Sequence, residues 1–106
     1  MTDKIVVLTT CNSQEQGAQL ARHLVERRLA ACVTVLPGGR SFYRWKDNIE
    51  NAAEHVLVIK SRRDVFPKLR DAILKMSPEE IPEVIAMPVV DGSEAYLNWL
   101  DGEIVS

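Results

Sequence analysis

The sequence predicts an α+β fold of the split β-α-β type, in which two helices cover one face of an antiparallel sheet. Three observations lead to this prediction. Four short apolar runs rich in strand-forming residues occur along the chain, helical spacing follows the first and third runs, and a compact turn signal joins the second to the third. At 106 residues, 46% hydrophobic and 26% charged, the chain fits one globular domain, residues 1–106.

The first strand and helix are predicted from residues 5–28. Residues 5–8 form an apolar, β-branched run that is typical of a strand buried on both faces. Ser13 and Gln16 have the spacing of a capping box, which predicts a helix over residues 13–28. The expected apolar stripe of this helix consists of Ala18, Ala21, Leu24, Val25 and Leu29.

A long hairpin follows. Residues 31–36 predict a second strand, and residues 41–45 continue it after an interruption at Pro37-Gly38-Gly39. An interruption of this kind inside a strand indicates a bulge or a sharp bend. Residues 46–48 carry a turn signal, and residues 55–60 form the returning strand. The hairpin tip is therefore expected near residues 46–48.

The last third of the chain repeats the pattern. Asp64 can cap a second helix whose first turn holds Pro67, and Ser77-Pro78 ends it. Its apolar stripe is expected to be Phe66, Leu69, Ile73 and Met76. Residues 84–87 predict a fourth core strand, and Ser93 begins a short helix. The order β-α-β-β-α-β with a C-terminal helix is the ferredoxin-like arrangement.

The hairpin strands are longer than the outer strands, so part of the hairpin is expected to extend past its own sheet. That part carries Phe42, Tyr43 and Trp45, and an aromatic two-stranded ribbon is not stable alone in water. We expect a neighbouring subunit to cover it, with Trp99 in the same interface. The alternative is that the hairpin folds back over its own core. These physical considerations do not choose between two subunits and three.

Charge and composition limit the classes of partner. The formal net charge is −2, which argues against nucleic acid and anionic membranes as partners. The start of the chain does not have the pattern of a signal peptide, and no apolar run approaches the ~20 residues that span a bilayer. We therefore expect a cytoplasmic protein, with Cys11 and Cys32 as free thiols.

Five motifs in register resemble the CutA divalent-cation-tolerance family over essentially the whole chain. They are Leu29-Ala30-Ala31-Cys32-Val33, Ser41-Phe42-Tyr43-Arg44-Trp45, Ile59-Lys60-Ser61, Ile81-Pro82-Glu83, and Asp91-Gly92 with Tyr96-Leu97-Asn98-Trp99-Leu100. The resemblance implies a PII-like homotrimer, a copper-related role in cation tolerance, and no catalytic activity. One departure stands out, because Ser77-Pro78-Glu79 replaces the family's His-Pro-Tyr and removes its histidine. Thr34 also stands where the family commonly has asparagine.

Four residues are candidate metal ligands. Cys32 and Cys11 offer soft thiolates suited to Cu(I) or Zn(II), and a helix N-terminus near Cys11 can lower a thiol pKa. Glu79 and Glu83 offer hard oxygens to a divalent cation. The structural alternatives are a core cysteine, a loop cysteine and a solvated acidic loop. His23 and His55 lack the spacing of a closed zinc site.

Cys32, Tyr43, Lys60 and Glu83 form a second candidate set. Lys60 ends an apolar strand, where its charge needs a partner or a route to solvent, and Glu83 is a candidate partner. The resemblance places these four positions around a cleft between subunits. We expect this cleft to bind a metal ion or a small anionic ligand. The alternative is a structural ion pair between Lys60 and Glu83.

Three other functions compete with a cation-related trimer. A small acyl-phosphate hydrolase has the same topology, but the loop at residues 9–13 lacks the glycine and arginine of an anion cradle. Residues 39–43 faintly resemble the aromatic platform of an RNA-binding domain. They lie on the second predicted strand, however, whereas the stacking aromatic residues of such a domain belong on the third. A signalling or scaffold trimer without metal is the third alternative.

Overall fold

The computed structural model describes residues 1–105, and Ser106, the last residue of the predicted domain, lies outside them. The elements are β1 (Lys4–Cys11), α1 (Gln14–Glu26), β2 (Cys32–Trp45), β3 (Asn48–Arg62), a 3-10 turn (Arg63–Val65), α2 (Phe66–Met76), β4 (Ile85–Pro88) and α3 (Glu94–Glu103). In residues 1–105 the strands form one four-stranded sheet in the order β2-β3-β1-β4, antiparallel throughout. The ferredoxin-like prediction is confirmed.

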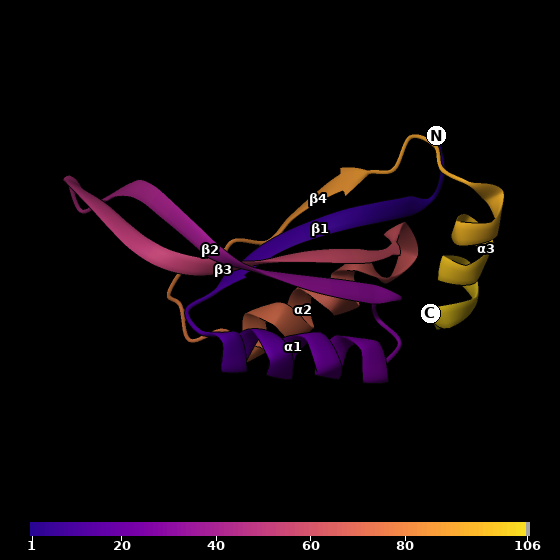
Figure 1. The fold of residues 1–106 in the computed structure, drawn as a ribbon, viewed down its shortest axis with the longest axis horizontal. Helices are drawn as coiled ribbons and strands as arrows, with labels where there is room; N and C mark the ends of the chain where they lie inside the picture. Colours follow the sequence, from indigo (N-terminus) through magenta and orange to yellow (C-terminus); the bar gives the residue numbers. More distant parts are fainter. Residues whose placement is uncertain (106) are drawn as a thin grey trace.

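The sheet has one covered face and one open face. Figure 1 shows α1 and α2 on the same side of the sheet, with α3 at the end where the two termini lie. The covered face holds the core, which includes Val7, Leu24, Leu57, Leu69 and Ile73, all fully buried. Residues of β1 are buried alternately, so the prediction that this strand is buried on both faces is wrong for the single chain.

The hairpin extends past the sheet as predicted. β1 pairs with β3 only as far as the Cys11–His55 pair, so residues 39–54 form a free two-stranded part that we call the ribbon. Figure 1 shows it reaching beyond the sheet, and the whole molecule is 45 Å long but only 25 by 24 Å across. Phe42 on the ribbon is 69% exposed. The alternative in which the hairpin folds back over its own core is wrong.

The interruption and the turn have the predicted geometry. The β2–β3 register shifts between Leu36 and Gly39, which is the expected bulge, and Gly38 adopts a φ of +87° there. A Cβ on Gly39 would lie 2.9 Å from the Glu54 carbonyl oxygen, so the close approach of the two strands requires glycine. Lys46 and Asp47 form a two-residue turn with φ values of +48° and +69°.

Both long helices differ from prediction in detail. Ser13 caps α1 by accepting a hydrogen bond from the Gln16 amide at 3.1 Å, as expected. The buried face of α1, however, is Gly17, Leu20 and Leu24, and Val25 is exposed. Asp64 does not cap α2, because its carboxylate instead accepts two hydrogen bonds from Arg62, at 2.7 and 3.0 Å.

β4 is an exposed edge strand, so the prediction of a fourth core strand is wrong for the single chain. Every residue of β4 is exposed, and within residues 1–105 this strand pairs only with β1. Ile85 and Met87 stand opposite Leu8 and Val6, which places them on the open face. The open face is therefore apolar and uncovered in one chain.

Ion pairs attach α3 to the sheet. The Asp101 carboxylate accepts a hydrogen bond from Arg62 Nη1 at 3.2 Å and lies 3.1 Å from Lys4 Nζ. Lys4 also forms an ion pair with Asp3. Leu100 of α3 is buried on the side of the helix that packs against the rest of the chain. Hydrogen bonding to Lys4, then to Arg62, lowers the pKa of Asp101 below its usual value.

This lowered pKa gives a pH dependence. Because the folded-state pKa lies below the unfolded value of about 3.9, the stabilisation is present above about pH 4 and is lost as the pH falls through the folded pKa. We expect Asp101→Asn to lower the urea midpoint at pH 7, and this effect to shrink progressively as the pH falls below about 4. Glu80→Gln is the matched control. An Asp101→Asn effect that stays constant as the pH falls would contradict this account.

Candidate functional site

Two adjoining hollows lie where the ribbon leaves the sheet. The smaller is a pocket of about 110 Å³ between the end of β1, the start of α1 and the end of α2. The larger is a groove of about 720 Å³ under the ribbon. Thr10, Asn12 and Glu79 line both hollows. These shared residues mark one continuous candidate binding region.

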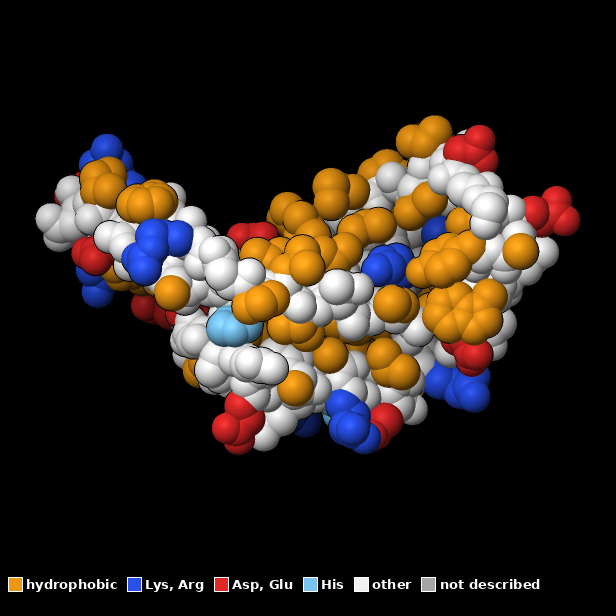
Figure 2. Space-filling view, viewed as in Figure 1, with side chains coloured by type: hydrophobic (Ala, Val, Ile, Leu, Met, Phe, Trp, Pro, Cys, Tyr) orange, Lys and Arg blue, Asp and Glu red, His pale blue; other side chains and the backbone are white. Residues whose placement is uncertain are grey.

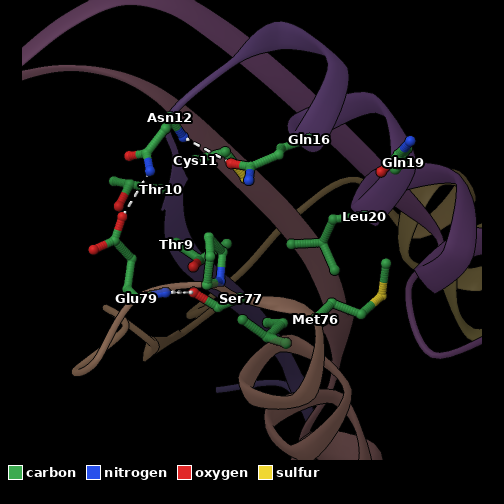
Figure 3. Close-up of a pocket in the computed structure, with 12 residues that line it drawn as sticks. Thr9, Thr10, Cys11, Asn12, Gln16, Gln19, Leu20, Met76, Ser77 and Glu79 are labelled. Atoms are coloured by element: carbon green, nitrogen blue, oxygen red, sulfur yellow. Dashed lines mark hydrogen bonds between the residues drawn. The ribbon is translucent and has the colours of Figure 1, made fainter.

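Glu79 is held in place between the two hollows. Its Oε1 accepts a hydrogen bond from Asn12 Nδ2 at 2.8 Å, and its amide donates to Ser77 Oγ at 3.2 Å. Gln16 Oε1 in turn accepts a hydrogen bond from the backbone amide of Asn12 at 3.2 Å (Figure 3). The glutamine of the predicted capping box therefore reaches the residue that precedes the N-cap Ser13. Ser77, which stands where the resemblance implies a histidine, helps to orient the acidic loop by accepting the hydrogen bond from the Glu79 amide.

The groove combines aromatic rings with carboxylates. Its aromatic residues are Phe42, Tyr43 and Trp45, and its acidic residues are Glu54, Glu79, Glu80 and Glu83. Carboxylate oxygens are the ligands that hard divalent cations prefer, and aromatic faces attract organic cations. The chemistry of this groove therefore favours positively charged ligands. Glu54 was missed by sequence reasoning because it precedes an apolar strand with no motif around it.

Cys11 lines the smaller pocket and is half-buried. Burial raises the pKa of its thiol, and the nearby Glu54 carboxylate raises it further. The expectation that a helix N-terminus lowers this pKa is therefore wrong. Near neutral pH the thiol is protonated, so Cys11 binds a metal only by giving up a proton.

Slow alkylation of Cys11 follows from the raised pKa. In a Cys32→Ser chain, we expect iodoacetamide at pH 7 to modify Cys11 several-fold more slowly than a cysteine in an unstructured peptide. Burial limits the access of the reagent to the sulfur atom and also lowers the fraction of the thiol that is present as thiolate. The rate should rise with pH, and urea should restore the peptide rate. A folded chain that reacts as fast as the peptide would disprove this prediction. Intact mass spectrometry provides the measurement.

Cys32 and Lys60 lie together on the open face. They are directly opposite one another in the β2–β3 register, and Lys60 Nζ donates a hydrogen bond to Thr34 Oγ1 at 3.4 Å. Tyr43 lies eleven residues further along β2, at about 3.4 Å per residue, and lines the groove with Glu83. Within one chain, the pair of Cys32 and Lys60 therefore lies apart from Tyr43 and Glu83, the other two predicted cleft residues.

The four predicted metal ligands are also divided. Cys11 lines the smaller pocket, Glu83 lines the groove, and Glu79 lines both. Cys32 lies level with Val6 across the sheet, so it is five residues, about 17 Å along the strand direction, and two strands away from Cys11. Within residues 1–105, no group of three or more His, Cys, Asp or Glu side chains is placed to hold a metal ion. A single chain does not supply a closed metal site from this set.

Fold and site define a class: a small ferredoxin-like protein with an extended ribbon and an acidic, aromatic groove. Residues 5–103 match the model of the family described as CutA1 divalent ion tolerance protein. The chain belongs to this family, as the five sequence motifs predicted.

Relatives and solved structures agree with this assignment. The chain is 41% identical over 95 residues to the divalent-cation tolerance protein CutA of Thermus thermophilus, covering 90% of this chain and 92% of that protein. It is 38% identical to the chloroplastic protein CutA of Arabidopsis thaliana, with 91% of this chain but only 53% of that protein covered. The crystal structure of CutA from Xylella fastidiosa superposes with a TM-score of 0.95 at 36% identity, covering 98% and 100% of the two chains.

These names describe tolerance to divalent ions rather than an enzymatic reaction. The chain spans about half the length of its plant relative. Of the helices in residues 1–105, none is sufficiently long and apolar to cross a bilayer.

Proposed function

We propose that the protein acts in divalent-cation tolerance as a non-catalytic homotrimer, which binds a metal ion or a small anionic ligand in a cleft between subunits. The exposed ribbon is the observation that carries this proposal. Phe42 and Tyr43 are exposed on a two-stranded segment, and the open face adds uncovered Leu36, Ile85 and Met87. Exposed apolar surface on this scale is typical of an interface. Figure 2 shows hydrophobic side chains on the ribbon and over the sheet.

The separated cleft residues support the same proposal. Cys32 and Lys60 lie on the open face of one chain, whereas Tyr43 lies far out along the ribbon. A ribbon laid across a neighbour's open face brings Tyr43 of one chain toward Cys32 and Lys60 of another. The Lys60 ammonium then supplies a positive charge for an anionic ligand, and Glu83 supplies a carboxylate for a cation.

The alternative is a signalling or scaffold trimer that binds no metal. It is favoured by the lack, within the described chain, of three clustered ligand side chains. In both cases we propose a cytoplasmic location, which the two free cysteines support because thiols stay reduced there. Names of relatives include a chloroplastic protein, so compartments differ within the family.

Two measurements test the proposal. Light scattering should give three times the 11.9 kDa chain mass at micromolar concentration. Calorimetric titration with Cu²⁺, Zn²⁺ and inorganic phosphate, alongside Trp45 and Trp99 fluorescence, should detect binding that Cys32→Ser, Lys60→Gln or Glu83→Gln weakens. A monomer overturns the trimer. A trimer that binds none of these ions supports the scaffold alternative.

A further inference from the structure

The Asp91-Gly92 motif lies in an exposed connection between β4 and α3. Both of its residues are exposed, and the chain is fixed on either side of them. Before the motif, the Val89 amide donates a hydrogen bond to the Lys4 carbonyl oxygen at 3.0 Å. After it, Ser93 is the N-cap of α3. The connection between these two fixed points is therefore short, and the proposed function gives it no role.

The Gly92 amide lies close to the side chain of the aspartate that precedes it. Its nitrogen donates a hydrogen bond to Asp91 Oδ1 at 2.8 Å. Because the carbon–oxygen bond of the carboxyl group is about 1.2 Å long, the carboxyl carbon lies within about 4 Å of this nitrogen. Within residues 1–105 the Gly92 amide makes no backbone hydrogen bond, and glycine has no Cβ to hinder the approach. The two atoms that join when an aspartate cyclises onto the next amide are therefore close together.

A second Asp-Gly pair, Asp101-Gly102, provides a contrast within the same chain. It lies inside α3, where backbone amides donate to the carbonyl groups four residues earlier. The Asp101 carboxylate is held by Lys4 Nζ at 3.1 Å and by Arg62 Nη1 at 3.2 Å. The helix engages the amide and the two cations hold the carboxylate, so this pair does not have the arrangement found at Asp91.

We propose that Asp91 is a site of spontaneous isomerisation, at which the bond to Gly92 is converted into an isoaspartyl linkage. The Gly92 nitrogen attacks Asp91 Cγ and forms a cyclic imide. One water molecule leaves, made from the amide hydrogen and the hydroxyl of the protonated carboxyl group. A second water molecule then breaks the bond between this nitrogen and the main-chain carbonyl carbon of Asp91. The chain afterwards runs through Cγ, and the former main-chain carbonyl carbon carries a free carboxylate.

The reaction is intramolecular, consumes no oxidant or reductant, and leaves the mass of the chain unchanged. It adds one carbon atom to the main chain between two fixed points. A Cβ on Gly92 would lie 3.2 Å from Leu97 Cδ2, so the start of α3 packs closely against this position. The free carboxylate is the chemical group that isoaspartyl carboxyl methyltransferases modify. The aged protein is therefore expected to be a substrate for this class of enzyme, whatever its ligand or assembly.

Ageing of the full-length oligomer at neutral pH and physiological temperature tests the site. Methyl transfer from S-adenosylmethionine by a purified isoaspartyl methyltransferase counts the isoaspartyl linkages, and electron-transfer fragmentation of the peptides locates them. We expect isoaspartate at Asp91 to form about as fast as in the same chain unfolded in guanidinium chloride. At Asp101 it should form at least about tenfold more slowly than in the unfolded chain.

Asp91→Glu keeps the charge but lengthens the side chain, so it should remove most of the methyl acceptance of the aged protein. Asp71→Glu is the matched control, because Asp71 is exposed and is followed by alanine. Folded protein that forms isoaspartate at Asp101 as fast as at Asp91 would overturn the inference. So would an Asp91 that stays unmodified while the unfolded chain reacts. Neither result affects the trimer mass or the ion titrations, which judge the proposed function separately.

Discussion

Replacing Leu69 with alanine is expected to lower the free energy of unfolding by about 3 kcal/mol. Leu69 lies on the covered side of α2, is fully buried, and packs in the core that includes Ile73 and Leu24. Removing its isobutyl group loses the transfer free energy of those carbons and leaves a cavity, because the sheet and α1 close the space only in part. Urea unfolding at one fixed protein concentration measures the loss, since assembly adds to apparent stability.

Leu74 provides a matched control on the same helix. It is 44% exposed, so Leu74→Ala should change the unfolding midpoint by a small fraction of the Leu69→Ala effect. Both variants make the same chemical change in α2 and keep its helix propensity equal. Similar losses from the two substitutions would mean that α2 is not oriented as described, or that an interface covers Leu74.

Replacing Phe42 with aspartate is expected to shift the assembled protein to a lower mass. Phe42 is the most exposed aromatic side chain of the ribbon, so the single chain loses little when it changes. In the proposed trimer this ring is covered, and a buried, unpaired carboxylate there costs several kcal/mol. That cost corresponds to a loss of assembly of a hundredfold or more. Sedimentation velocity over a range of concentrations provides the measurement.

Val25→Asp is the control for the charge introduced. Val25 is an exposed apolar residue of α1, far from the ribbon, so this variant should keep the wild-type mass. Circular dichroism checks that both variants retain their secondary structure. A Phe42→Asp protein that sediments like the wild type would show that the ribbon lies outside the interface, and the trimer would need a different surface.

The hairpin was the most predictable part of the molecule. Its signals are local: an interruption with two glycines and a turn signal at residues 46–48. Each signal acts over a few residues, so a bulge and a turn can be placed without knowledge of the tertiary structure. The predicted turn and the register shift both appear in the structure. The extension of the ribbon past the sheet was also predictable, because the sequence shows that the two hairpin strands are longer than the outer strands.

The face of α1 that packs on the sheet was harder to predict. Hydrophobic spacing selected Ala18 and Val25, whereas the structure buries Gly17 and Leu20. A Cβ on Gly17 would lie 3.2 Å from Val35 Cγ1, so the absence of a side chain allows α1 to approach the sheet closely. Glycine does not count as an apolar residue when hydrophobic spacing is used to choose the buried face of a helix. The predicted buried face of α1 was therefore rotated about the helix axis relative to the face that the structure buries.

The candidate site was only partly predictable, because sequence patterns do not give distances between elements. The resemblance named Cys32, Tyr43, Lys60 and Glu83, yet one chain places them in two pairs. The hydrogen bond from Asn12 to Glu79 joins residues 67 positions apart, and neither residue carries a motif for it.

The tight tip of the ribbon limits how its length can change during evolution. Lys46 and Asp47 make the whole connection, and the pairs from Trp45–Asn48 to Gly39–Glu54 follow without a break. Because side chains alternate between faces, Tyr43 and Trp45 share one side and Phe42 takes the other. One inserted residue in an arm would exchange these sides, so tolerated insertions and deletions should come as two residues in each arm.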